Sequence, residues 1–219
     1  DLKVFVVMGD GDCTSIGAGH WIHAVRYNVD MVALLLDNNI YGLTKKQTSP
    51  TTPQGYKSNT QPRGSYLPPL NPIEATLGVT NASFVAQTAE WVPQHMFETL
   101  KQAYDHKGFS FVRIMQRCPH FTADLFQRAV REPDALEFMV HENGIDLPDL
   151  TKIYKNRVVH DPSDIDAARS MAKESENLRI GVFFRDEDRP IYEETRHLSH
   201  LTVDQKMEIM EKEFDRYAV

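Results

Sequence analysis

Residues 4–11, VFVVMGDG, and residues 31–39, MVALLLDNN, decide the fold of this chain. Each is a continuous apolar run that ends in polar residues, which is the pattern of a central parallel strand buried on both faces. One amphipathic helix lies between them, which Thr14 or Ser15 can cap and Asn28 ends. The order of strand, glycine turn, helix and strand predicts a βαβ unit.

The alternation of strands and helices continues downstream. Further strands are predicted at 83–86, 109–115 and 180–184, and helices at 72–77, 93–106, 163–175 and from Thr202 onwards. This order favours an α/β fold with a mostly parallel sheet and helices on both faces. We expect an α/β domain over residues 1–125. The more charged residues 126–219 are predicted to form a C-terminal extension that completes the domain or packs on it.

The last helix carries its own sequence signals. The spacing of Thr202 and Gln205 predicts a capping box at its start. An apolar stripe follows at helical spacing, formed by Met207, Met210, Phe214 and Tyr217. We expect this stripe to pack against the domain or against a partner.

Residues 41–71 are rich in proline, glycine, serine and threonine, and they can form neither a long helix nor a central strand. A loop of this length in a compact domain is usually functional or disordered. The segment is therefore a candidate lid or partner-binding arm.

The composition excludes several classes of protein. With 219 residues, 41% of them hydrophobic, the chain can bury a core, and its net charge of −7 disfavours a nucleic-acid-binding surface. No apolar run is long enough to span a membrane, and no signal peptide opens the chain. Two cysteines make no disulfide framework, so a cytoplasmic protein is expected. The chain begins at Asp1 without a starting Met, and we expect residues upstream of it.

Polar residues follow both of the deciding strands. Asp10 lies in the turn after the first strand, and Asn38 follows the second. Ligands of open α/β sheets bind beyond the carboxyl ends of the strands, so both side chains can face one site. Carboxylate and amide oxygens are ligands that Mg²⁺ prefers, and Gly11 and the next helix N-terminus suit a diphosphate. A magnesium diphosphate site is therefore predicted, whereas a lone Gly-Asp-Gly would only indicate a tight turn.

The spacing is more specific than either half alone. Gly-Asp-Gly, then 26 residues, then Asn38-Asn39 resembles the fingerprint of thiamine-diphosphate enzymes. The resemblance implies the thiamine-diphosphate-binding fold of the pyrophosphate type. It also implies that Mg²⁺ is held by Asp10, Asn38 and the carbonyl of Ile40.

A narrower resemblance rests on a longer stretch. Residues 9–12, 16–17, 20–23 and 26–28, with the run DNNIYGLTKKQTSPTT at 37–52, resemble the β subunit of 2-oxoacid:ferredoxin oxidoreductases. Cys118-Pro119 and residues 181–194 resemble it more weakly. The chain departs from the family at Lys46, where glycine is usual, so the backbone of this loop is expected to differ.

The resemblance implies an enzyme that decarboxylates a 2-oxoacid to acyl-coenzyme A. Its electrons pass through a [4Fe–4S] cluster to ferredoxin, and the reverse carboxylation is equally implied. An α subunit is expected to supply the rest of the active site. The Lys-Lys-Gln and Ser-Pro-Thr-Thr sequences resemble the 2-oxoglutarate or broad 2-oxoacid branch of the family more than the pyruvate branch, so 2-oxoglutarate is the expected substrate.

The resemblance also assigns roles to individual residues. It places Lys45 on the substrate carboxylate. Cys118 matches the fourth cysteine ligand of the cluster, whose other ligands are expected upstream of residue 1. Residues implied to bind the cofactor are Gly9, Asp10, Gly11, Asp12, Cys13, His20, Asn38, Ile40, Gly42, Leu43 and Thr44. Cys13 could equally be a small packing residue, and Lys45 a solvated loop lysine.

Other functions stay open at this point. A thiamine-diphosphate decarboxylase or transketolase relative would share the fingerprint without any cluster. A non-catalytic interaction domain would have lost the cofactor. His20 and His23 stand one helical turn apart and could hold a metal, but the sequence shows no third ligand at a matching spacing.

Overall fold

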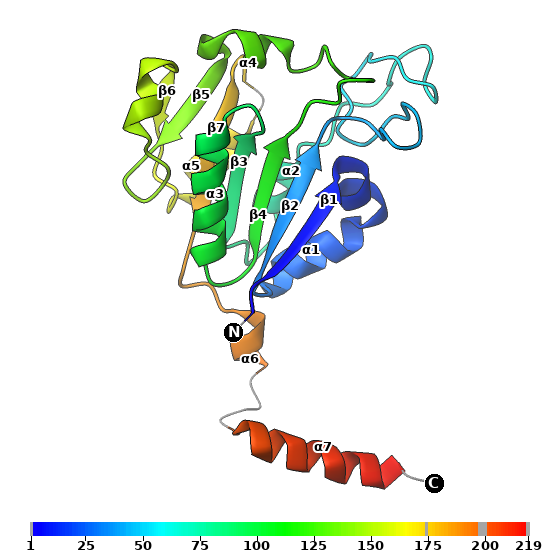
Figure 1. Cartoon of the computed structure of the whole chain (residues 1–219), viewed down its shortest axis with the longest axis vertical. Helices are drawn as coiled ribbons and strands as arrows, with labels where there is room; N and C mark the ends of the chain where they lie inside the picture. Colours follow the sequence, from blue (N-terminus) through cyan, green and yellow to red (C-terminus); the bar gives the residue numbers. More distant parts are fainter. Residues whose placement is uncertain (1, 174, 197–200, 218–219) are drawn as a thin grey trace.

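The computed structural model describes residues 2–173, 175–196 and 201–217. Its centre is a seven-stranded sheet in the order β1-β2-β4-β3-β7-β5-β6 (Figure 1). Neighbouring strands are parallel except β3 and β7, which are antiparallel. The strands are β1 (Val4–Gly9), β2 (Met31–Asp37), β3 (Phe84–Ala89), β4 (Ser110–Met115), β5 (Leu136–Val140), β6 (Arg157–Val159) and β7 (Leu178–Arg185).

Helices cover both faces of this sheet. On one face pack α1 (Ala18–Tyr27), α2 (Pro72–Leu77) and α5 (Ile165–Ala172), and on the other packs α3 (Pro93–Asp105). Shorter helices are α4 (Gln127–Arg131), α6 (Tyr192–Thr195), the π-helix η1 (Asp12–Ile16) and the 3-10 helices η2 (Pro133–Ala135) and η3 (Pro148–Lys152). The predicted α/β fold with a mostly parallel sheet is confirmed. Among the described helices, none is long and apolar enough to cross a membrane.

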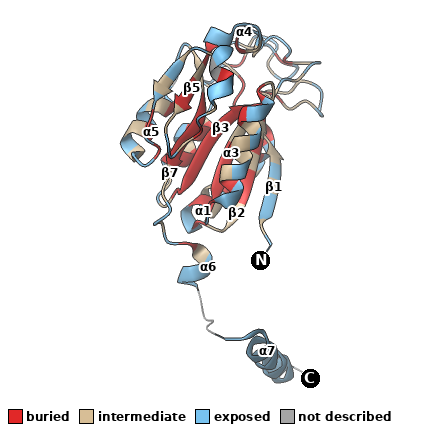
Figure 2. Ribbon diagram, turned by 60° about the vertical axis from the view of Figure 1, so that its left-hand side comes forward, coloured by how far each residue is buried: buried red, intermediate tan, exposed pale blue. Residues whose placement is uncertain are grey.

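The first strand is not the central strand that its apolar run predicted. β1 lies at the edge of the sheet, and Val4, Phe5 and Val7 remain 46–59% exposed (Figure 2). The expectation of burial on both faces was therefore wrong for β1, although it fits β2, which lies between β1 and β4. A continuous apolar run does not distinguish an inner strand from an edge strand, because both have the same local pattern.

The second half of the chain adds strands that the sequence did not reveal. β5 and β6 had not been predicted, and they extend the sheet beyond β7. Both are short, at five and three residues, so their hydrophobic periodicity is weak. Residues after 126 thus contribute three strands to the same sheet as residues 1–125.

The last helix forms as predicted but does not pack as predicted. Helix α7 (Val203–Tyr217) opens with the predicted capping box, in which Thr202 N donates to Gln205 Oε1 at 2.8 Å and Gln205 N donates to Thr202 Oγ1 at 3.3 Å. All of its described residues are exposed (Figure 2). Packing against the domain is not seen in the described residues, and packing against a partner stays a prediction.

The 41–71 loop is folded onto the carboxyl ends of the first strands. It buries Ser49, Thr51 and Thr52, and its backbone bonds to itself through Gly55 N and Ser65 O at 2.7 Å. The loop thus closes over the part of the sheet where the fingerprint residues lie (Figure 1).

Candidate functional site

A cavity of about 460 Å³ lies at the carboxyl ends of β1 and β2. Its walls come from the turn after β1 and the segment after β2, so the two strand ends do face one site as predicted. The lining residues are Gly9, Asp10, Gly11, Asp12, Ile16, Asn38, Ile40, Tyr41, Gly42, Leu43, Thr44 and Gln47.

Gly11 is required by a close approach in the turn after β1. A Cβ on Gly11 would lie 2.0 Å from the ring of Tyr41, whose hydroxyl donates to the Gly11 carbonyl at 3.1 Å. The turn continues into η1, which has no side-chain cap. The Asp12 carboxylate accepts a hydrogen bond from the backbone N–H of Gly9 at 3.1 Å, which ties the start of η1 back to the end of β1. Glycine at position 11 is therefore what allows the Tyr41 ring to pack directly on the turn beside the cavity.

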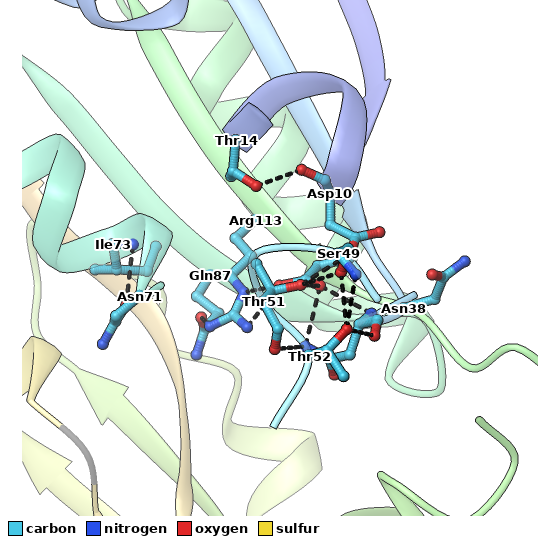
Figure 3. Close-up of polar contacts among 12 residues, drawn as sticks. Asp10, Thr14, Asn38, Ser49, Thr51, Thr52, Asn71, Ile73, Gln87 and Arg113 are labelled. Carbon is cyan, nitrogen blue, oxygen red and sulfur yellow. Dashed lines mark hydrogen bonds and ion pairs between the residues drawn. The ribbon is translucent and has the colours of Figure 1, made fainter. Parts of the chain in front are cut away.

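Asp10 is a buried carboxylate in the cavity wall. It is 2% exposed, and Thr51 Oγ1 lies 2.9 Å from its Oδ2 (Figure 3). Burial raises the pKa of Asp10 to about 6, the nearby Asp37 adds to this rise, and the hydroxyls of Ser49 and Thr51 oppose it. Among the residues that the structure describes, none forms an ion pair with Asp10.

Asp37, at the end of β2, is the second buried carboxylate, and it does have a cation. Arg113 on β4 binds Asp37 Oδ2 through Nη2 at 2.6 Å and through Nε at 2.7 Å. The third nitrogen of the guanidinium donates to Gln87 Oε1 on β3 at 3.1 Å. Asp37 Oδ1 accepts from the backbone N–H and the side-chain amide of Asn39 at 3.1 and 3.2 Å. The charge of Asp37 is thus compensated within the protein.

Asn38 and Ile40 both line the cavity beside Asp10. Asn38 Oδ1 accepts from the backbone N–H of Ile40 at 3.2 Å, so the two residues form one compact turn. Thr122 Oγ1 donates to the Asn38 carbonyl at 2.9 Å and fixes this turn from the segment after β4. Residues carrying a carboxylate and an amide, Asp10 and Asn38, are therefore gathered with Ile40 at one wall.

Most of the predicted cofactor-binding residues lie together. Nine of the eleven line the cavity, and these are Gly9, Asp10, Gly11, Asp12, Asn38, Ile40, Gly42, Leu43 and Thr44. Cys13 is fully buried in the core, where burial raises the pKa of its thiol to about 12. His20 is exposed on α1 and is not in the cavity wall. The structure thus places Cys13 as a packing residue and does not bring His20 to the site.

The predicted substrate and cluster residues lie beside the cavity. Lys45 is exposed next to Thr44, and its φ of 70° is in the left-handed region. Cys118, after β4, is half-buried, and its sulfur is 3.8 Å from where a Cβ on Gly42 would be. Within the described residues, no group of three or more His, Cys, Asp or Glu side chains could hold a metal.

Sequence reasoning missed the residues that surround Asp10. Asp37, Thr51 and Arg113 form a continuous polar cluster with it, although none had been singled out as a site residue. A signal was available in the Ser-Pro-Thr-Thr sequence of the loop and in an arginine inside an apolar strand. Neither signal could be assigned to the site without knowing which strands are neighbours in the sheet.

The site fits a divalent cation with an anionic ligand. A buried carboxylate without a cation is unfavourable, and a metal ion facing the cavity would compensate it. The side chains of Asp10 and Asn38 offer oxygens, as Mg²⁺ requires, and the glycine turn that follows β1 lines the cavity where a diphosphate would bind.

Comparison with known families agrees with this chemistry. Residues 1–114 match the family described as "Thiamine pyrophosphate enzyme, C-terminal TPP binding domain". Residues 149–200 match the family of the C-terminal part of the pyruvate ferredoxin oxidoreductase β chain. The chain therefore belongs to the thiamine pyrophosphate enzymes and is a homologue of the β subunits of 2-oxoacid:ferredoxin oxidoreductases.

Individual relatives carry the same names. The chain is 34% identical over 203 residues to a 2-oxoacid:ferredoxin oxidoreductase β subunit of Sulfolobus, a match covering 89% of this chain and 61% of that protein. It is 42% identical over 140 residues to 2-oxoglutarate oxidoreductase subunit KorB of Mycobacterium tuberculosis, covering 64% of this chain and 37% of the relative. The chain thus spans less than two thirds of these relatives.

A solved structure shows the same fold. The 2-oxoglutarate:ferredoxin oxidoreductase of Magnetococcus marinus, determined with 2-oxoglutarate, coenzyme A and succinyl-CoA bound, is 31% identical to this chain. The TM-score is 0.73, and the match covers 98% of this chain and 63% of that one.

Proposed function

We propose that this chain binds thiamine diphosphate and Mg²⁺ as the β subunit of a 2-oxoacid:ferredoxin oxidoreductase. The observation that carries the proposal is Asp10. It is a buried carboxylate without a cation among the described residues, and it lies in the wall of a cavity with Asn38 and Ile40. A Mg²⁺ ion bound there would supply the missing positive charge.

The residues of the cavity divide the binding tasks. Asp10, Asn38 and the Ile40 carbonyl would hold the metal, and the diphosphate would lie against the turn at residues 9–12 that lines the same cavity. Asp12, Gly42, Leu43 and Thr44 would line the remaining cofactor surface. When bound, thiamine diphosphate supplies the chemistry that breaks the bond between the carboxylate and the 2-oxo carbon.

Lys45 is proposed to recognise the substrate carboxylate by a charge-assisted hydrogen bond. Its support is position, because it follows Thr44 of the cavity wall and is exposed. The best substrate is 2-oxoglutarate, which agrees with the names of the relatives. Replacing Lys45 with Met should lower kcat/KM for 2-oxoacids while thiamine diphosphate binding stays near normal. Unchanged activity would make Lys45 an ordinary loop lysine.

Cys118 is proposed as one ligand of a [4Fe–4S] cluster whose other cysteines lie outside this chain. The support is again position, since its sulfur lies beside Gly42 of the cavity wall, a short path for electrons. The Cys118→Ser variant of the assembled, anaerobically purified enzyme should lose the paramagnetic resonance signal of the cluster and the reduction of ferredoxin. Full iron content with normal ferredoxin reduction would show that Cys118 is structural.

The remaining partners follow from the same proposal. An α subunit would complete the active site, coenzyme A would take the acyl group, and ferredoxin would take the electrons. We place the reaction in the cytoplasm, where the unpaired Cys13 and Cys118 would stay reduced.

The decisive experiment is cofactor binding. In the intact protein assembled with its partners, calorimetry should detect thiamine diphosphate binding that requires Mg²⁺. Asp10→Ala or Asn38→Ala should abolish it, because each removes an oxygen ligand. Thr76→Val, which removes a buried hydroxyl from α2 outside the cavity, serves as the control. Full affinity in Asp10→Ala would refute the site, and a wild type without binding would favour a non-catalytic interaction domain.

A further inference from the structure

We infer that Thr51 is a positioning residue for the metal site, holding the Asp10 carboxylate in place, and that the Asp37–Arg113 ion pair anchors Thr51. The inference rests on the proposed function, because it assigns a role toward the same Mg²⁺ ion. Thr51 itself does not line the cavity, so it would act through Asp10 and not as a ligand.

The geometry places one hydroxyl between two buried carboxylates. Thr51 Oγ1 lies 2.9 Å from Asp10 Oδ2 and 2.9 Å from Asp37 Oδ1 (Figure 3). Thr51 is 2% exposed, so water does not compete for these contacts. Its backbone carbonyl accepts from the side-chain amide of Asn39 at 2.9 Å. Thr51 is thus bound through both its side chain and its backbone to the ends of β1 and β2.

The number of donors decides which carboxylate receives the Thr51 hydrogen. A hydroxyl has one hydrogen and can donate it to one acceptor at a time. Asp37 already accepts two bonds from Arg113 and two from Asn39. The Asp10 carboxylate has only the hydroxyls of Thr51 and Ser49 and its own backbone N–H as donors among the described residues, and none of these is charged. The hydrogen therefore serves Asp10, where it fixes Oδ2.

The ion pair explains why Asp10 keeps its charge available. All three nitrogens of the Arg113 guanidinium are engaged by Asp37 and Gln87, so the arginine does not reach Asp10. A cation that neutralised Asp10 directly would compete with Mg²⁺. In this cluster the neutral hydroxyl of Thr51 orients Asp10. Arg113 binds Asp37, the carboxylate on the other side of Thr51.

Thr52 offers a matched comparison in the same loop. It is as buried as Thr51, at 1% against 2% exposed. Its hydroxyl donates to the Asn39 carbonyl at 2.6 Å and accepts from the Ser49 backbone N–H at 2.9 Å. It touches neither Asp10 nor Asp37. Its Oγ1 also lies 3.2 Å from Ser49 Oγ. Removing this hydroxyl therefore disturbs the same loop, including Ser49, but removes no direct contact with either carboxylate.

The test compares Thr51→Val, Thr51→Ser and Thr52→Val in the intact assembled protein. At fixed thiamine diphosphate, the Mg²⁺ dependence of binding is measured by calorimetry, and the folding of each ligand-free variant is measured by thermal unfolding. A hydrogen bond to a charged group contributes about 1.5–3 kcal/mol, so Thr51→Val should weaken apparent Mg²⁺ affinity about 10- to 100-fold. Thr51→Ser keeps the donor and should remain within about threefold of the wild type, as should Thr52→Val.

Each outcome separates the two proposals. If Thr51→Val binds Mg²⁺ with wild-type affinity, the inference about Thr51 is overturned. If Asp10→Ala abolishes binding in the same experiment, the proposed metal site at Asp10 still stands. Equal losses in Thr51→Val and Thr52→Val would also overturn it, since the loop alone would then be responsible. Should Thr51→Val not fold, Thr51→Cys, a weak donor of similar size to serine, decides by the same criterion. A wild type that binds no cofactor would overturn the proposed function and this inference together.

Discussion

Two clusters of buried polar groups lie at opposite ends of the same strands. The amino-end cluster precedes β2, β3 and β4 and consists of Asn28, Ser83, His106 and the backbone of Phe109. The carboxyl-end cluster follows β1 and β2 and consists of Asp10, Asp37, Thr51 and Arg113. Both bury several polar side chains, yet only one of them contains charged groups.

The amino-end cluster is neutral and holds the fold together. Asn28 Oδ1 accepts from Ser83 Oγ at 2.6 Å and from Phe109 N at 2.7 Å. His106 Nε2 lies 2.9 Å from Ser83 Oγ, and because that hydroxyl donates to Asn28, the imidazole carries its hydrogen on Nε2. Asn28 adopts φ of 52°, which an asparagine tolerates as a helix end. His106 Nδ1 is buried without a hydrogen-bond partner among the described residues, but the cluster contains no charged group that a ligand would have to compensate.

The carboxyl-end cluster is not balanced by its own groups. It contains two buried carboxylates and one arginine. Of the two carboxylates, Arg113 binds only that of Asp37. Complete polar clusters stabilise a fold, whereas a cluster that lacks one cation destabilises it until a ligand binds. The difference between the two ends therefore separates a structural cluster from a binding site.

The largest effect is expected from breaking the one ion pair of the carboxyl-end cluster. Arg113→Met leaves Asp37 buried without a cation, which should lower the free energy of unfolding by about 3–5 kcal/mol. Arg117→Met is the control, because its pair with Glu90 has the same 2.6 Å distance but is partly exposed, at 44% and 28% against 15% and 0% for Arg113 and Asp37. It should cost at most about 1 kcal/mol. Urea denaturation of both variants measures the difference, and equal losses would contradict the assignment of Arg113.

The two clusters should respond to pH with opposite signs. Burial, the first cause, lowers the pKa of His106 from 6.5 to about 4, so its contribution is present above pH 6.5 and is lost as the pH falls toward 4. The pKa of Asp10 is raised from 3.8 to about 6, so its contribution is present below pH 3.8 and is lost as the pH rises to 6. At about 1.4 kcal/mol per pKa unit, each change amounts to about 3 kcal/mol.

Chemical denaturation of the metal-free protein between pH 3.5 and 8 checks these signs. His106→Gln should flatten the loss of stability on the acidic side, and Asp10→Asn should raise stability above pH 6. Adding Mg²⁺ and thiamine diphosphate should restore the wild type above pH 6 but not Asp10→Asn. Because the two effects oppose each other between pH 4 and 6 in the wild type, the Asp10 effect is read in the His106→Gln background, where stability should fall as the pH rises from 4 to 6. A His106→Gln variant whose stability does not fall over this range would refute the unbalanced charge of Asp10.

In the carboxyl-end cluster, the sequence predicted Asp10 and its neighbour Asn38 as site residues but not the residues that contact Asp10. Asp10 and Asn38 could be brought together because the carboxyl ends of consecutive parallel strands meet at one edge. Arg113 could not be assigned to Asp37, because their contact requires β4 to lie next to β2, and local pattern does not reveal strand order. The placement of β1 at the edge was missed for the same reason. His20, which the resemblance assigns to the cofactor, is exposed on α1 and does not line the cavity, so its role stays a prediction.

A middle-sized effect is expected at the neutral end. Asn28→Ala removes the acceptor of two buried donors and should lower the free energy of unfolding by about 2 kcal/mol, without changing cofactor affinity. Asn81→Ala is the control, because Asn81 also has positive φ, 73°, but is only half-buried and lies outside the cluster. Its loss should be smaller in thermal unfolding. A change in thiamine diphosphate affinity for Asn28→Ala would show that the two ends are coupled.

The smallest effect concerns the loop that carries Thr51. Lys46 adopts φ of 66°, a conformation that glycine takes more easily than any other residue, and glycine is the residue that family resemblance leads one to expect there. Its ammonium lies 5.4 Å from the centre of the Tyr56 ring, a contact that both glycine and alanine would lose. Comparing Lys46→Gly with Lys46→Ala therefore isolates the backbone.

Lys46→Gly should be more stable than Lys46→Ala by about 1 kcal/mol, because only glycine relieves the left-handed backbone. Lys101, exposed within α3, provides the opposite case. There glycine should be less stable than alanine by about 1 kcal/mol, since a helix interior disfavours it. Thermal unfolding of the four variants measures both differences. The same sign at both positions would mean that the loop over the carboxyl-end cluster does not hold this turn, and that Thr51 is kept in place by its contacts with Asp10, Asp37 and Asn39 alone.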